Sequence, residues 1–118
     1  FQRAKAAIGV GIQVLLEYAG MSYDDLQRIC VGGAFGHALN VCKAQRIGLL
    51  PPIAPARVEL GGNTALAGSE EALLSPSVLQ EMRQISKQAK IINLSSYSNF
   101  DILYMENLFL HPMHREKM

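Results

Sequence analysis

The sequence predicts a mixed α/β fold in which helices cover a small sheet. Helical and strand-like patterns alternate along its 118 residues, and this alternation is typical of layered α/β structures rather than of helix bundles. The length suits one domain with one hydrophobic core. Apolar residues make up 49% of the chain and charged residues 18%. This balance excludes intrinsic disorder, which requires low hydrophobicity and high net charge.

The composition also points away from several kinds of partner. A net charge of +1 gives no surplus that would favour nucleic acid or an anionic membrane. The longest apolar stretch, Ala6–Leu16, is shorter than the roughly 20 apolar residues that span a bilayer. Cys30 and Cys42 are not in a C-x-x-C arrangement, and their apolar surroundings predict inert, buried thiols in a reducing, cytoplasmic setting without a metal site. Because the chain opens on Phe1 inside a helical pattern, we expect a fragment of a larger protein.

The first helix is predicted from Gln2 to Tyr18. Its apolar residues recur with helical spacing, and Gly20 is placed to end it. Gly9 and Gly11 inside this helix each cost about 1 kcal/mol relative to alanine. The missing side chains must therefore bring a compensating gain, which is either close packing against a neighbouring element or the close approach of a ligand.

Two of the three predicted strands run into a pair of glycines. Arg28–Val31 is almost wholly apolar, which is typical of a buried strand. Arg57–Leu60 alternates polar and apolar residues. Glycines follow at 32–33 and at 61–62, so the order of strand, paired glycines and helix occurs twice in the chain.

Caps and helix breakers predict the remaining elements. They are a capping turn at Ser22–Asp25, a helix at Val41–Ile47 capped by Asn40 and ended by Gly48, a helix from Asn63-Thr64 to Leu74, a polar amphipathic helix at Ser77–Lys90 after the break at Ser75-Pro76, a third strand at Ile91–Leu94, and a helix at Asn99–Leu110 capped by Ser98. The tail His111–Met118 is expected to be frayed. His111 and His114 therefore lack the rigid support that a pair of metal ligands needs.

The glycine turns are the candidate functional feature. Glycine removes the β-carbon, and free N–H groups at the start of a helix favour polar or negative ligand groups. The motif VGGAFG at Val31–Gly36 is neither the G-x-G-x-x-G dinucleotide fingerprint nor a P-loop. Nucleotide binding and tight-turn packing both remain open for these glycines. His37, which follows the first turn, is either a contact to phosphate or ribose or an ordinary surface residue.

The chain resembles the last subdomain of a group of actin-like ATPases, the ferredoxin-fused reductive activators of corrinoid proteins. The resemblance extends over about 100 residues in the same order. The residues that carry it are Gln2–Ile8, Gly11-Ile12, Leu15-Leu16, VGGAFG, Ala44, Ile47–Pro51, Gly62-Asn63, Ala65-Leu66, Gly68, Leu73–Ser75, Leu94-Ser95 and Phe100. The sequence departs from the group at Gly32, where an alanine is frequent, and at Asn40-Val41, where an acidic residue is frequent. These departures leave room for an altered specificity.

The resemblance implies an RNase-H-like half domain, with a mixed sheet flanked by helices, that closes over ATP as the C-terminal subdomain (residues 1–118) of a longer chain. The residues that would line the nucleoside are Gly32, Gly33, Phe35 and Gly36, with Gly61, Gly62 and Asn63 in the neighbouring turn. Lys5 lies where related ATPases carry a basic residue near the adenine. The phosphate loops, the Mg-binding acids and the iron–sulfur cluster would belong to the upstream half, so no catalytic residue is assigned to this chain and the fragment alone should be inactive.

The implied function is ATP-driven reduction of a cobalt(II) corrinoid protein to cobalt(I), using electrons from an iron–sulfur cluster elsewhere in the parent protein. Two alternatives stay open, namely a subdomain of another actin-like ATPase (a dehydratase activator or sugar kinase) and a non-catalytic interaction module with this fold. The implied partners are the upstream half and a corrinoid protein. Low charge and a C-terminal third rich in Met and aromatic residues also predict self-association of the excised fragment, with a homodimer as its smallest form.

Overall fold

The computed structural model describes residues 1–113. For Phe35 it describes the backbone alone. These residues form two compact units. The first unit comprises residues 1–29, 39–59 and 93–113, and the second comprises residues 30–38 and 60–92. Every buried hydrophobic residue of the described chain lies in the first unit. They are Ala6, Val10, Val14, Tyr23, Ala44, Leu49, Leu50, Ile53 and Met113.

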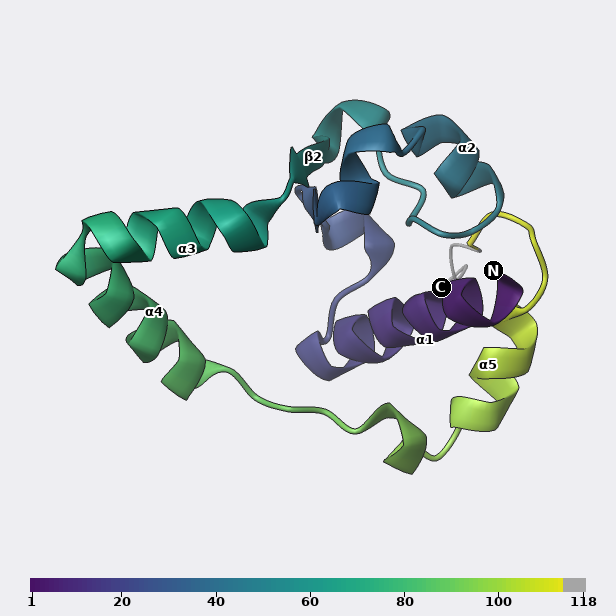
Figure 1. Ribbon diagram of the computed structural model, residues 1–118. Helices are drawn as coiled ribbons and strands as arrows, with labels where there is room; N and C mark the ends of the chain where they lie inside the picture. Colours follow the sequence, from purple (N-terminus) through teal and green to yellow (C-terminus); the bar gives the residue numbers. More distant parts are fainter. Residues whose placement is uncertain (114–118) are drawn as a thin grey trace. The chain divides into compact units, whose positions relative to one another are not determined.

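Helix α1 (Gln2–Ala19) is the longest helix of the first unit and packs against α5 (Phe100–Asn107) (Figure 1). The predicted helix is confirmed, and Gly20 ends it in the left-handed conformation with φ 65°. A β-carbon built on Gly9 would overlap the side-chain oxygen of Asn107 and lie 2.9 Å from its Cγ. Close packing of two helices, rather than a ligand, therefore accounts for the glycine at position 9.

Short capped elements complete the first unit. The predicted capping turn is the 3₁₀ turn η1 (Tyr23–Asp25), and it carries a capping box in which the Ser22 N–H donates to Asp25 Oδ2 at 2.8 Å. Helix α2 (Val41–Arg46) begins as predicted, because the side chain of Asn40 accepts the backbone N–H of Lys43 at 3.0 Å. A further 3₁₀ turn, η3 (Pro55–Arg57), leads into the second strand.

The sheet has two strands, β1 (Ile29–Gly32) and β2 (Val58–Gly62). They run parallel, because Arg28 pairs with Glu59 at their beginnings and Gly33 N–H donates to Gly62 O at their ends. The residues of β1 alternate between half-buried and exposed. The prediction of a fully buried first strand is therefore wrong.

The predicted third strand at Ile91–Leu94 is also wrong. Residues 89–93 have no regular structure, and Leu94–Ser96 forms a 3₁₀ turn, η4. The side-chain oxygen of Asn93 accepts both the backbone N–H (3.1 Å) and the hydroxyl (2.6 Å) of Ser95. Such local bonds from asparagine favour a turn over an extended strand. Helix α5 likewise starts after Asn99 rather than Ser98 and ends at Asn107 rather than Leu110.

The second unit carries a hairpin of two helices, α3 (Thr64–Leu74) and α4 (Pro76–Gln88) (Figure 1). Asn63 caps α3 by accepting the Leu66 N–H at 3.1 Å, and Pro76 opens α4 at its first position, as predicted. Ser75 precedes α4 without a side-chain bond to its backbone. A β-carbon on Gly68 of α3 would lie 3.6 Å from Met82 Cε of α4, so the two helices approach closely there.

The tail is described as far as Met113, which is buried, so the prediction of a wholly frayed tail is wrong for that residue. His114 lies outside the described residues. Among the helices of residues 1–113, none combines the length and apolar character that a membrane crossing requires.

Candidate functional site at the glycine turns

The structure brings the two glycine turns together within the second unit. The first turn joins β1 to the 3₁₀ segment η2 (Ala34–Ala38), and the second joins β2 to α3. Gly33 N–H donates to Gly62 O at 2.6 Å, and Gly36 N–H donates to Gly33 O at 3.1 Å. The predicted site residues of the two turns, which the sequence places about 30 positions apart, are therefore neighbours.

Three of these glycines pack closely against other atoms of the chain. A β-carbon on Gly32 would lie 2.6 Å from Thr64 Oγ1, and one on Gly61 would lie 3.1 Å from Thr64 Cγ2. A β-carbon on Gly36 would lie 3.1 Å from the Val31 carbonyl oxygen. The space beside these α-carbons is thus already filled by the chain itself.

Gly62 combines packing with a special backbone conformation. It is buried, and its φ of 65° lies in the left-handed region that favours glycine. A β-carbon there would overlap Nε2 of His37 and lie 2.8 Å from its Cδ2. The imidazole of His37 therefore covers the side of Gly62 where any other residue would carry a side chain.

Gly33 differs from the other glycines of the two turns. Its φ is 93°, and within the described chain no atom lies within 4 Å of the position that a β-carbon would take. Gly33 is thus the point at which a ligand can approach the backbone directly. Sequence reasoning proposed the whole glycine set; the geometry singles out one open member.

The two turns contain no carboxylate, lysine or arginine side chain. Residues 30–42 and 60–69 include no Asp, Glu, Lys or Arg, and the site consists of peptide groups, small or apolar side chains and the imidazole of His37. A neutral ligand group that combines apolar faces with hydrogen-bonding edges suits such surroundings, whereas a phosphate group normally requires cations or a metal ion. Asn63 serves as the cap of α3, and Phe35 lies in η2 with its side chain outside the described part.

Lys5, the remaining predicted site residue, lies in the first unit and is 2% exposed. Its Nζ donates to the carbonyls of Asn107 at 2.7 Å and of Phe109 at 2.9 Å. The amino group thus satisfies carbonyls at the end of α5, and burial lowers its pKa from 10.5. Its contact with an adenine stays a prediction.

Sequence reasoning missed the role of Thr64. This residue follows Gly62-Asn63 at the first position of α3 and fills the space beside two glycines. A small β-branched residue directly after a glycine turn and an asparagine cap was the available signal. Its side chain leaves little room for a β-carbon at Gly32 of β1 and at Gly61 of β2.

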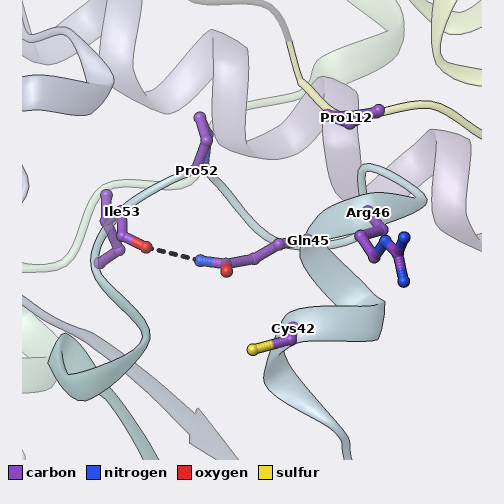
Figure 2. A pocket seen from close by; sticks show the side chains of 6 residues that line it. All are labelled: Cys42, Gln45, Arg46, Pro52, Ile53 and Pro112. Carbon is purple, nitrogen blue, oxygen red and sulfur yellow. Dashed lines mark hydrogen bonds between the residues drawn. The ribbon is translucent and has the colours of Figure 1, made fainter.

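A shallow cavity of about 360 Å³ lies in the first unit, and its lining includes none of the predicted site residues (Figure 2). Its lining consists of Cys42, Gln45, Arg46, Pro52, Ile53 and Pro112. Gln45 Nε2 donates to the carbonyls of Pro51 at 3.0 Å and Ile53 at 2.7 Å, which fixes the proline-rich loop. Figure 2 shows the Cys42 side chain at this cavity.

The two cysteines contradict the sequence prediction, because both Cys30 and Cys42 are exposed rather than buried. Cys30 lies on the exposed side of the alternating strand β1, and Cys42 lies on the outer face of α2. Within the described residues, no group of three or more His, Cys, Asp or Glu side chains is placed to hold a metal ion.

Comparison with known proteins defines the class. A model of the protein family described as the C-terminal domain of RACo, the ASKHA domain, matches residues 1–118. The chain belongs to this family, which confirms the actin-like ATPase resemblance. The match defines an ASKHA domain, and the structure shows its mixed α/β character with a small parallel sheet.

The individual relatives are activators of corrinoid proteins. The chain is 39% identical over 106 residues to "Corrinoid activation enzyme RamQ" of Eubacterium limosum, covering 90% of this chain and 18% of the relative. It is 30% identical over 105 residues to "[Co(II) methylated amine-specific corrinoid protein] reductase" of Methanosarcina barkeri, covering 87% and 19%. The solved structure of a "Reductive activator for corrinoid,iron-sulfur protein" matches with a TM-score of 0.86 and 32% identity, covering 93% of this chain and 18% of that one. The chain thus spans about a fifth of the length of these relatives.

Proposed function

We propose that this chain is the nucleoside-binding C-terminal subdomain of an ATP-dependent reductive activator of corrinoid proteins. The names of its relatives support the activator context. The observation that carries the nucleoside assignment is the open space beside Gly33, at the junction of two turns without charged residues. An adenosine group can approach the backbone there, and its phosphates would extend toward groups elsewhere in the parent protein.

The donor groups of this chain fit one part of the proposed cofactor set. Peptide groups at Gly33 and the neighbouring glycine turn would hold the nucleoside, with Gly32, Gly36, Gly61 and Gly62 forming the turn framework. The two turns offer no carboxylate for Mg²⁺, and an iron–sulfur cluster needs four thiolates where this sequence has two cysteines. Mg²⁺ and the cluster therefore belong to the upstream half in this proposal.

When bound, ATP would favour one conformation of the parent protein over another. Such a difference in affinity between two conformations is needed if ATP is to drive an unfavourable electron transfer. The residues of this chain would contribute one wall of the closing cleft. We infer that β1 and β2 belong to a larger, RNase-H-like sheet that the upstream half completes. We also infer a reducing, cytoplasmic setting for the parent, in which the exposed side chains of Cys30 and Cys42 would stay thiols.

The proposal is tested by calorimetric titration of Mg·ATP and Mg·ADP into the proposed parent, as wild type and as Gly33→Asn. Asparagine tolerates the left-handed conformation better than other side chains, and its amide would enter the open space. We expect binding of both nucleotides to weaken by the same factor, about tenfold or more, because the site contacts the nucleoside rather than the γ-phosphate.

Gly20→Asn is the matched control. Gly20 is also left-handed with φ 65° and also has open space beside it, but it ends α1 in the first unit. This variant should bind like wild type, and ATP-dependent cobalt reduction, followed by absorbance, should need a higher ATP concentration in Gly33→Asn only. Equal binding by Gly33→Asn would show that the site is misplaced. A wild-type parent that binds neither nucleotide would identify the chain as an interaction module.

A further inference from the structure

His37 lies in η2, outside the set of residues that the proposed site uses, and its side chain is exposed. Its ring occupies the space beside the α-carbon of Gly62, where a β-carbon would lie 2.8 Å from Cδ2 and closer still to Nε2. Gly62 is nevertheless buried. The imidazole is therefore one of the groups that cover the second glycine turn, although it comes from the segment that follows the first turn.

Gly62 in turn holds Gly33. Its carbonyl accepts the Gly33 N–H at 2.6 Å, and Gly33 has φ 93° beside open space. Glycine populates positive and negative φ about equally, so an isolated glycine does not stay in one conformation. A contact series from His37 through Gly62 to Gly33 supplies the restraint that the open position needs.

His37 acts in this series through the shape of its ring. In the described part of the chain it makes no hydrogen bond or ion pair, and residues 30–42 contain no acidic or basic partner for it. The contact with Gly62 is therefore one of van der Waals packing. A flat side chain of similar size would preserve it, whereas a methyl group would not.

We propose that His37 is a positioning residue of the nucleoside site: its imidazole holds Gly62, and through the Gly62 carbonyl it keeps Gly33 in the left-handed conformation that leaves the approach to the backbone open. This inference rests on the proposed function. It adds a residue from outside the glycine motifs and assigns it a packing role rather than a bond to the ligand.

The first test measures Mg·ATP affinity of the proposed parent by calorimetry for wild type, His37→Ala and His37→Phe. We expect His37→Ala to weaken binding by about tenfold and His37→Phe to restore most of the loss, because phenylalanine keeps a flat ring without nitrogen atoms. His111→Ala removes an exposed imidazole from the first unit and should leave the affinity unchanged.

The second test is a double-variant cycle with Gly62→Ala, whose methyl group must displace the imidazole. Gly62→Ala alone should weaken binding at least as much as His37→Ala. The combined variant should be little worse than Gly62→Ala, because both changes remove the same contact. Additive losses would contradict the proposed series from His37 to Gly62.

The outcomes separate this inference from the proposed function. A wild-type parent that binds no nucleotide overturns both. A wild-type parent that binds while His37→Ala binds equally well overturns the positioning role alone. Loss of affinity in His37→Phe to the level of His37→Ala also overturns it, since the ring nitrogens would then be required. Weakening in His37→Ala with recovery in His37→Phe and non-additive losses in the cycle supports it.

Discussion

The two units of this chain are stabilised in different ways. All the buried hydrophobic residues lie in the first unit, where α1 and α5 pack around a buried lysine and a buried asparagine. In the second unit, no hydrophobic side chain that the structure describes is buried, and the buried residues there are Gly36 and Gly62. The first unit is held by a core, whereas the second is held by glycine turns, caps and one helix-to-helix contact.

This difference locates stability and candidate function in separate parts of the molecule. Loss of a buried group should destabilise the first unit, which also exposes large apolar side chains such as Phe1 and Phe109. The second unit exposes large apolar side chains without a buried hydrophobic core among its described residues. These are Leu66, Leu73, Leu74, Leu79, Met82, Ile85 and Ile91. Leu73 and Leu74 are adjacent in the chain and both exposed, and exposed apolar side chains that adjoin one another mark surfaces that another chain or domain covers. Substitutions in the two units should therefore differ in kind as well as in size.

The largest effect is expected for Lys5→Ala in the first unit. The substitution leaves the Asn107 and Phe109 carbonyls without their donor and opens a cavity beside α1. Unsatisfied buried groups and lost packing together should cost about 3–4 kcal/mol in the free energy of unfolding, measured with urea. Arg3→Ala, on the exposed side of α1, is the control and should change it by less than about 0.5 kcal/mol. Similar values for both variants would contradict a structural role for Lys5.

Gly9→Ala should also destabilise the first unit, although alanine is the better helix former. Its methyl group would overlap Asn107, whose amide is fixed by bonds to Gln13 Oε1 at 2.9 Å and to Leu103 O at 2.8 Å. Overpacking in a buried contact costs about 1–3 kcal/mol, which outweighs the gain of about 1 kcal/mol in helix propensity. Urea unfolding should therefore show a net loss.

Gly11→Ala gives the matched control for that experiment. A β-carbon at position 11 would lie 3.7 Å from Leu94 Cδ1, an ordinary contact distance. The helix propensity of alanine should then prevail, and the variant should be neutral or more stable by up to about 1 kcal/mol. A stabilised Gly9→Ala would show that Asn107 can move aside and that packing does not require this glycine.

Sequence patterns predicted the helices of this chain better than its third strand and the burial of its cysteines. Helices α1 to α4 were predicted to within a few residues because their ends depend on local chemistry, such as the Asn40 and Asn63 caps. The pattern at Ile91–Leu94 resembled a strand, but bonds from Asn93 within the same segment produced a turn. Burial of Cys30 and Cys42 was predicted wrongly, because apolar neighbours in sequence do not determine which face of an element meets the core.

In the candidate site too, the motifs could be predicted from the sequence, whereas the contacts between distant residues could not. The glycine pairs after the two strands could be recognised from the sequence, including the member that leaves open space. Which spaces are filled depends on residues far along the chain, since Thr64 occupies the space beside Gly32 and His37 that beside Gly62. Periodicity and motif spacing contain no information about such contacts. Packing and ligand approach could therefore be distinguished only with the structure.

In the second unit, the double variant Leu73→Ser/Leu74→Ser should change association rather than stability. Both leucines are 86% exposed, so the free energy of unfolding should stay within about 0.5 kcal/mol of wild type. We expect light scattering at high protein concentration to show self-association of the wild-type chain and a smaller species for the variant. A monodisperse wild-type monomer would contradict the idea that this surface needs a cover.

The smallest effect on the free energy of unfolding is expected for Tyr97, which lies in the first unit and is hydrogen-bonded to α1 of the same unit. Its hydroxyl donates to Glu17 Oε2, and this hydrogen bond raises the pKa of Tyr97 above 10.0. The unfolded chain then loses this proton before the folded chain does, so the stabilising contribution is complete below pH 10.0 and declines as the pH rises above that value. Lys5 acts in the opposite sense, because its lowered pKa makes stability increase with pH up to 10.5.

Urea unfolding of wild type and Tyr97→Phe from pH 8 to pH 11 separates the two groups. The difference between the two proteins should be constant at the lower pH values and shrink above pH 10.0, while the Lys5 contribution cancels. A difference that does not change with pH would show that the bond to Glu17 does not discriminate between the two protonation states of Tyr97.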